Sequence, residues 1–207
     1  ILNGIDVDVF NPATDPDIVK NYDANTFQDG KAVCKAALQD EMHLNKDGSP
    51  VMAMVTRLVG HKGVALVRSI AEGLLQQGIE LVILGSGEAQ YENFFNELCA
   101  RHPGRVGVYI GFNAKLAQRI YSGADIFLMP SRSEPCGLAQ MVSCRYGTIP
   151  VVRETGGLRD SIRASGDGFC NGFTLAHYTA HELYEAFWTH TEGYRQTDSY
   201  TPPSTRP

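Results

Sequence analysis

The chain has 207 residues, of which 43% are hydrophobic, and its formal net charge is −5 at pH 7. This size and composition allow one globular domain with a sizeable core, and the acidic balance without a cluster of Lys and Arg argues against a nucleic-acid-binding surface. No apolar run approaches the roughly 20 residues needed to cross a membrane, and the amino terminus has no signal-peptide pattern.

The cysteines and histidines give no sign of a metal site. The five cysteines form no Cys-x-x-Cys pair, and an odd number cannot all pair within the chain. A reduced, cytosol-like compartment is the simpler interpretation. The six histidines are scattered without metal-binding spacing. The chain starts at Ile1 without an initiator methionine, which suggests a fragment or an excised domain.

Strand-like and helix-like segments alternate along most of the chain. The first fifty residues contain one predicted helix, at about residues 31–41, and a predicted loop at residues 46–50. Short apolar runs predict strands at residues 51–55, 81–84, 106–110, 126–129 and 149–152. Amphipathic stretches predict helices at residues 63–77, 89–101, 114–122, 138–146 and 180–188. Strands that are apolar throughout, each followed by a helix, indicate a parallel sheet covered on both faces.

The sequence therefore predicts an α/β fold with a doubly wound parallel sheet. We expect residues 1–50 to pack on the domain, residues 51–190 to form a Rossmann-like domain, and residues 191–207 to be a disordered tail. Such sheets bind ligands beyond the carboxyl ends of their strands. The loops that follow the predicted strands are therefore where a binding site is expected.

A pair of cations follows the first predicted strand. Arg57 ends that strand, and Lys62 comes five residues later, where a helix should begin. Two cations beside the free N–H groups of a helix amino terminus can bind a diphosphate. An arbitrary Arg/Lys pair is more often a solvated basic turn, but the position at the carboxyl end of a strand favours the phosphate interpretation.

An acidic loop, Glu134-Pro135-Cys136-Gly137-Leu138, follows the fourth predicted strand. Glu134 lies between this strand and the next helix, so its carboxylate can accept hydrogen bonds from sugar hydroxyls. The N–H groups of residues 136–139 can face a phosphate or a developing oxyanion. The alternative is that Glu134 is a surface residue or a helix cap. Pro135, which restricts the loop, and Gly137, which permits close approach, favour the binding role.

Three other features are weaker candidates. The Gly85-Ser86-Gly87-Glu88 turn lacks the third glycine of the dinucleotide-binding motif and follows the wrong strand for it, so a tight strand-to-helix turn is favoured over a ligand contact. For Thr155-Gly156-Gly157, a phosphate-facing turn and a flexible connection are equally good interpretations. Cys136 has no identifiable His or Asp partner, so a packed side chain is favoured over a nucleophile. No Walker A pattern is present, which argues against phosphoryl transfer from a nucleoside triphosphate.

Several short segments occur in the order and spacing of a known family. They are Asn3-Gly4-Ile5-Asp6, Thr56-Arg57-Leu58 with Lys62-Gly63, Leu84-Gly85-Ser86-Gly87, Ile110-Gly111-Phe112, Ser131-Arg132-Ser133-Glu134-Pro135-Cys136-Gly137-Leu138, Tyr146-Gly147-Thr148 and Thr155-Gly156-Gly157-Leu158-Arg159-Asp160. Over about residues 1–188 the chain resembles the bacterial-type glycogen and starch synthases, which are retaining glucosyltransferases that use ADP-glucose.

The resemblance implies the GT-B arrangement, in which two Rossmann-like domains face each other across a cleft. The chain resembles the carboxyl-terminal domain, with residues 1–50 on the side of the interdomain linker. The implied partners are ADP-glucose, an α-1,4-glucan and the amino-terminal domain; nucleic acid, membrane, metal and cofactor are not expected. Without the amino-terminal domain the chain should be inactive. The implied location is the cytoplasm, or the plastid for a plant starch synthase.

The resemblance also implies roles for individual residues. Arg57 and Lys62 should stabilise the ADP diphosphate as the glycosidic bond breaks, and Glu134 should bind glucose hydroxyls. The backbone of Cys136 and Gly137 should approach the sugar, Leu138 and Ala139 should lie by the ribose and phosphates, and Gly111 and Phe112 should lie against adenine. The implied catalytic residues are thus Arg57, Lys62 and Glu134, and the implied nucleotide-sugar-binding residues are Gly85, Gly111, Phe112, Cys136, Gly137, Leu138 and Ala139.

Two substitutions depart from the family pattern. Ala139 stands where bacterial members usually have Thr, and Phe112 replaces the commoner Tyr, so two polar contacts near the nucleotide are expected to be absent. A glycosyltransferase with another nucleotide sugar and a noncatalytic nucleotide-binding module are the alternative functions. The Pro-Cys-Gly-Leu form of the acidic loop favours the glucan synthase.

Overall fold

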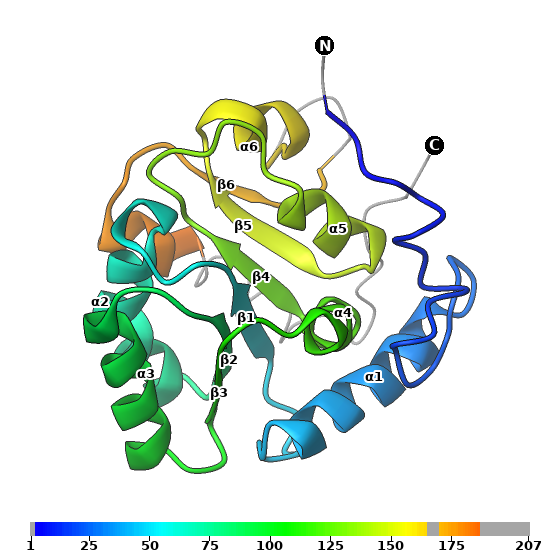
Figure 1. Cartoon of the computed structure of the whole chain (residues 1–207), viewed down its shortest axis with the longest axis horizontal. Helices are drawn as coiled ribbons and strands as arrows, with labels where there is room; N and C mark the ends of the chain where they lie inside the picture. Colours follow the sequence, from blue (N-terminus) through cyan, green and yellow to red (C-terminus); the bar gives the residue numbers. More distant parts are fainter. Residues whose placement is uncertain (1–2, 165–169, 187–207) are drawn as a thin grey trace.

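The computed structural model describes residues 3–164 and 170–186. The predicted tail at residues 191–207 and the end of the last predicted helix lie outside these residues. Within residues 3–164 and 170–186, six parallel strands form one sheet in the order β3-β2-β1-β4-β5-β6 (Figure 1). The strands are β1 (Val51–Val55), β2 (Glu80–Gly85), β3 (Val106–Ile110), β4 (Ile126–Met129), β5 (Ile149–Arg153) and β6 (Phe173–Leu175). The α/β class and the doubly wound parallel sheet are confirmed.

Among the described residues, helix α1 precedes the first strand, five further α-helices and a 3-10 helix lie between successive strands, and residues 180–186 are also helical. They are α1 (Phe27–Glu41), η1 (Gly60–Lys62), α2 (Val64–Gln76), α3 (Ala89–Arg101), α4 (Ala114–Gly123), α5 (Ala139–Arg145) and α6 (Gly156–Ser161). Helix α1 starts at Phe27 rather than at the predicted residue 31; the sequence placed the start too late because Gly30, a poor helix former, lies in the first turn, where close contact with Tyr22 requires a glycine. A Cβ on Gly30 would lie 2.3 Å from the Cβ of Tyr22.

Side chains of the central strands alternate between two apolar cores, which explains why these strands are apolar throughout. In β1, Met52 and Met54 join a core with α2, α3 and residues 180–186, while Val51 and Ala53 join a core with α1 and α4 on the other face. β6 was not predicted, because it has only three residues and lies at the edge of the sheet.

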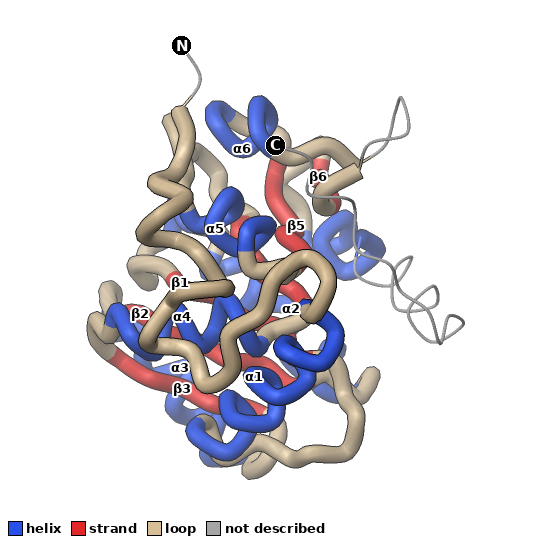
Figure 2. The backbone as a smooth tube through the Cα atoms, turned by 90° about the vertical axis from the view of Figure 1, so that its right-hand side faces the viewer, coloured by secondary structure: helices blue, strands red, loops and turns tan. Residues whose placement is uncertain are grey.

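The segment before α1 runs over the side of the molecule formed by α4 and α5 (Figure 2). Tyr22 donates a hydrogen bond of 2.8 Å from its hydroxyl to the carbonyl of Tyr146, and the Tyr146 hydroxyl donates to the Asp15 carboxylate at 2.5 Å. Arg145 of α5 donates to the carbonyl of Phe10. These contacts attach the early loop to the end of α5.

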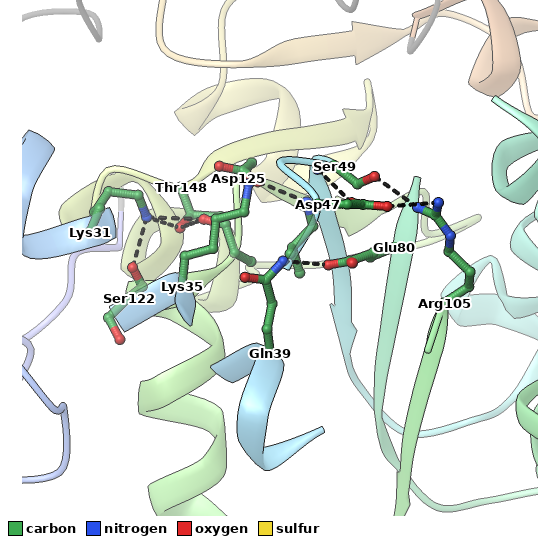
Figure 3. A network of polar contacts seen from close by, with 12 residues as sticks. Lys31, Lys35, Gln39, Asp47, Ser49, Glu80, Arg105, Ser122, Asp125 and Thr148 are labelled. Carbon is green, nitrogen blue, oxygen red and sulfur yellow. Dashed lines mark hydrogen bonds and ion pairs between the residues drawn. The ribbon is translucent and has the colours of Figure 1, made fainter. Parts of the chain in front are cut away.

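A network of polar side chains ties α1 to the amino ends of the strands (Figure 3). Lys31, Lys35 and Gln39 follow one another at intervals of four residues, so they share one stripe of the helix. Lys31 Nζ lies within hydrogen-bond distance of Thr148 Oγ1, at 2.8 Å, and of three backbone carbonyls, and Lys35 forms an ion pair of 2.6 Å with Asp125. Gln39 Nε2 donates to Glu80 Oε2 at 2.7 Å. Helix α1 is therefore an integral part of the domain.

Glu80 supplies a test of this network. Its carboxylate is buried at the start of β2, and burial raises the pKa of Glu80 above its ordinary value of 4.5. Folding therefore disfavours the charged form of Glu80. The loss of stability that this charge causes is zero below pH 4.5 and increases as the pH rises through the raised pKa.

We expect Glu80→Gln to raise the free energy of unfolding at pH 7.5, with a smaller gain at pH 5. Urea titrations at the two pH values measure this difference. Glu97→Gln, on the exposed side of α3, is the control and should show no such pH dependence. A Glu80→Gln variant that is no more stable than the wild type at pH 7.5 would refute the interpretation.

Candidate functional site

The site is organised where the strand order reverses. The chain leaves β1 toward β2 and leaves β4 toward β5, so the loops after β1 and β4 diverge, and a crevice opens at this topological switch point. The two loops are in contact before they diverge. Gly63, with φ +80°, lies so close to Pro130 that a Cβ would be 2.2 Å from its carbonyl oxygen. Arg132 N–H donates to the carbonyl of His61 at 2.8 Å.

This contact brings two of the three predicted catalytic residues together. Lys62 Nζ lies 2.5 Å from Glu134 Oε2, and the two side chains are only 18% and 9% exposed. Partial shielding from water strengthens their attraction. An ammonium group has three donors, so Lys62 can hold Glu134 and still bind an anion in the crevice.

The third predicted catalytic residue is on the same loop but is not part of the pair. Contrary to the prediction, Arg57 does not end β1 but lies two residues beyond its end; it is exposed, and within the described residues its side chain has no hydrogen-bond or ion-pair partner. Its guanidinium is therefore available to an anion that approaches the loop from solvent.

The loop after β1 is also joined to the loop after β2 by backbone hydrogen bonds. Leu58 N–H donates to the carbonyl of Ser86 at 2.9 Å, and Glu88 N–H donates back to the carbonyl of Leu58 at 2.8 Å. A Cβ on Gly85 or Gly87 would lie 1.8 Å or 2.3 Å from a backbone oxygen of the β1 loop. The glycines of the Gly85–Glu88 turn are therefore required for packing between the two loops.

The acidic loop rests on the amino end of α6. Gly157 N–H donates to the carbonyl of Glu134 at 3.1 Å, and a Cβ on Gly157 would lie 1.9 Å from the carbonyl oxygen of Cys136. Gly156, with φ +46°, approaches the Glu134 carbonyl equally closely. The structure thus gives Thr155-Gly156-Gly157 a supporting role that neither sequence interpretation included.

The remaining predicted residues line the same carboxyl edge of the sheet. Phe112 is 92% exposed and Leu138 is 50% exposed, and α5 begins at Ala139. Gly111, with φ +145°, donates its N–H to the carbonyl of Gly85 at 3.0 Å. An exposed aromatic ring beside a crevice can stack on a planar ligand.

Cys136 and Gly137 complete the acidic loop. Cys136 Sγ accepts a hydrogen bond of 3.0 Å from Asn3 Nδ2, and among the described residues it has no His or Asp partner that could activate it. Gly137 has φ +69°, a conformation that favours glycine.

Sequence reasoning missed Gln140 and Tyr178. Gln140 is buried at the start of α5 and holds the acidic loop, and the Tyr178 hydroxyl donates to the carbonyl of Gly60 at 3.3 Å. A glutamine fully buried in the first turn of a helix shows no apolar or charge pattern in the sequence. Only its contacts identify it.

Within residues 3–164 and 170–186, no group of three or more His, Cys, Asp or Glu could hold a metal ion. None of the helices in this part of the chain is long and apolar enough to span a membrane.

Comparison with known families gives a match over most of the chain. A family model described as "Glycosyl transferases group 1" matches residues 37–189. The glycogen synthase of Desulforudis audaxviator is 48% identical over 200 residues, which are 95% of this chain and 39% of that protein. The glycogen synthase of Geobacillus thermodenitrificans is 44% identical over 201 residues, with 95% and 41% covered. The chain therefore spans about two fifths of the length of these relatives.

Two solved structures are also similar to this chain. The catalytic domain of starch synthase IV from Arabidopsis thaliana, bound to ADP and acarbose, superposes with a TM-score of 0.89 at 35% identity, covering 96% of this chain and 42% of that one. HepE from Anabaena, in complex with UDP-glucose, superposes with a TM-score of 0.66 at 20% identity, covering 95% and 48%. The likeness to HepE shows the fold alone.

Gly63 allows a test of the contact between the β1 and β4 loops. Gly63→Ala should lower the free energy of unfolding by about 3 kcal/mol or more, because the strained φ and the overlap with a backbone oxygen act together. Gly78 has φ +81° with nothing within 4 Å of its Cβ position, so Gly78→Ala should cost only about 1–2 kcal/mol. Urea unfolding of both variants measures the difference. Equal losses would show that the loops are not in close contact.

Proposed function

We propose that this chain, which belongs to the group 1 glycosyl transferases, is the nucleotide-sugar-binding domain of a glycogen or starch synthase. The parent enzyme transfers glucose from ADP-glucose to the nonreducing end of an α-1,4-glucan with retention of configuration. The observation that carries this proposal is the Lys62–Glu134 pair at the switch point of the sheet. The names of the relatives and the ADP bound to starch synthase IV support the choice of donor.

The cations serve the diphosphate end of the donor. Negative charge grows on the leaving ADP as the glycosidic bond breaks, and Lys62 and the exposed Arg57 can stabilise it. One preorganised donor of this kind contributes roughly 3 kcal/mol to transition-state stabilisation in comparable sites. The proposed reaction requires no cofactor other than its substrate.

Glu134 serves the sugar end. Its carboxylate accepts hydrogen bonds, so it can bind glucose hydroxyls while Lys62 contacts the adjoining phosphate. The bond that breaks joins the sugar to the diphosphate. The two side chains, in contact at 2.5 Å, are therefore arranged side by side next to that bond, with one suited to each end of it.

The nucleotide extends along the carboxyl edge from this pair. Phe112 offers an open aromatic face to adenine, next to the Gly111 backbone. Leu138 and Ala139 begin α5 beside the acidic loop and lie by the ribose and phosphates. Gly85 keeps the β1 and β2 loops together below the nucleotide.

The chain contributes one wall of the active site. It covers 39% of one glycogen synthase and 42% of the catalytic domain of starch synthase IV. Under this proposal the acceptor glucan binds an amino-terminal domain on the facing wall. The chain alone is inactive under this proposal. The parent acts in the cytoplasm, or in the plastid of a plant, and the five free cysteines support a reducing compartment.

Calorimetric titration with ADP, ADP-glucose and UDP tests the proposal. The chain should bind ADP and ADP-glucose and bind UDP more weakly. Lys62→Ala and Arg57→Ala should each weaken ADP binding about tenfold or more, because a charge-assisted contact is lost. Lys46→Ala, at the opposite edge of the sheet, is the control and should leave ADP affinity unchanged. Absence of ADP binding at millimolar concentration would refute the proposal, and a preference for UDP would indicate a different donor.

A further inference from the structure

Gln140 is a buried polar residue next to the acidic loop. It is the second residue of α5 and is completely shielded from solvent. Its Nε2 donates to the carbonyl of Gly137 at 3.0 Å and lies 3.4 Å from the carbonyl of Cys136. The same nitrogen donates to Ser161 Oγ of α6 at 3.0 Å. One amide group thus contacts both the acidic loop and the helix that supports it.

The neighbouring hydroxyl fixes the orientation of this amide. Ser161 Oγ donates its hydrogen to the carbonyl of Gly157 at 2.7 Å, so it accepts from Gln140. With two carbonyls and this oxygen around it, the NH₂ end of Gln140 must face them. The Oε1 end is buried, without a hydrogen-bond partner among the described residues. In this orientation the Nε2 group of Gln140 contacts the loop carbonyls, while its Oε1 acceptor has no hydrogen bond among the described residues.

The contacts enclose the acidic loop from both ends. Gly157 N–H binds the carbonyl of Glu134 at the start of the loop, and Gln140 binds the carbonyl of Gly137 at its end. Ser161 joins the two by hydrogen bonds to Gln140 and Gly157. A Cβ on Gly137 would lie 2.5 Å from Gln140 Oε1, so the loop backbone rests directly on this amide.

We infer that Gln140 is a positioning residue for the sugar end of the donor site. It holds the backbone at Cys136 and Gly137, and through it the carboxylate of Glu134, in the geometry that binds the hexose. It does not touch the β1 loop that carries Arg57 and Lys62. This inference rests on the proposed function, and it separates the two ends of the donor: loss of Gln140 affects recognition of the sugar more than recognition of ADP.

The test is the ratio of the dissociation constants for ADP-glucose and ADP. Gln140→Met keeps the length of the side chain and removes its donors. The ratio should rise about tenfold, the change expected when hydrogen bonds worth about 1.4 kcal/mol no longer hold the loop. Gln39→Met is the matched control, because Gln39 is also buried but donates to Glu80 at the opposite edge of the sheet. It should lower stability and leave the ratio unchanged.

A second variant distinguishes positioning from packing. In Gln140→Glu the buried carboxylate repels the two carbonyls when charged, but its protonated form can donate to one of them. The ratio, taken relative to the wild type at each pH, should therefore be raised at pH 8 and partly restored at pH 5.5. Gln140→Met should show no such restoration. Gln140→Met is neutral at both pH values and has no donor, so the comparison of the two variants separates loss of the donor from the effect of a buried charge.

The outcomes separate the inference from the proposal on which it rests. A wild-type chain that binds neither ADP nor ADP-glucose overturns the proposed function, and the inference with it. A wild-type chain that binds both, with a Gln140→Met ratio within twofold of the wild type, overturns the inference alone. If Gln140→Met does not fold, Gln140→Glu decides: a ratio within twofold of the wild type at both pH 8 and pH 5.5 overturns the inference.

Discussion

The close approach of Gly63 to Pro130 is the contact on which the site depends. At the switch point of the sheet, loops from β1 and β4 would otherwise diverge, and a side chain at residue 63 would overlap the Pro130 carbonyl. Because the backbones touch there, Lys62 and Glu134 meet as a shielded ion pair although 72 residues separate them. Every role proposed for the carboxyl edge assumes this geometry.

The two edges of the sheet use polar residues differently. At the amino edge, Lys35 is paired with Asp125 and Lys31 is bonded to Thr148, and these bonds fasten α1 to the strands. At the carboxyl edge, Arg57 is exposed and the donors of Lys62 are not exhausted by Glu134. Polar groups that are satisfied within the protein stabilise the fold, whereas groups held in place with unused donors can bind a ligand. This contrast explains why the nucleotide sugar is assigned to one edge only.

Much of the fold was predictable from the sequence, because strands buried on both faces are continuous apolar runs. The limits of β1, β3 and β4 were predicted correctly, whereas the short edge strand β6 was missed. For the site, the sequence predicted which loops carry Lys62 and Glu134. It did not predict their ion pair, the support from Gly156 and Gly157, or the role of Gln140, because these depend on backbone contacts between distant segments. The family resemblance, rather than the residue pattern, supplied ADP-glucose and glucan.

The most direct test of the central claim is to map the amide resonances of the isotopically labelled chain by NMR during titration with ADP. We predict that the perturbed amides cluster in the loops at the carboxyl edge, at residues 56–63, 111–113 and 130–139, while the amino-edge residues 47–50 and 124–126 stay unchanged. Perturbations centred on the amino edge, or spread evenly over the chain, would contradict this prediction.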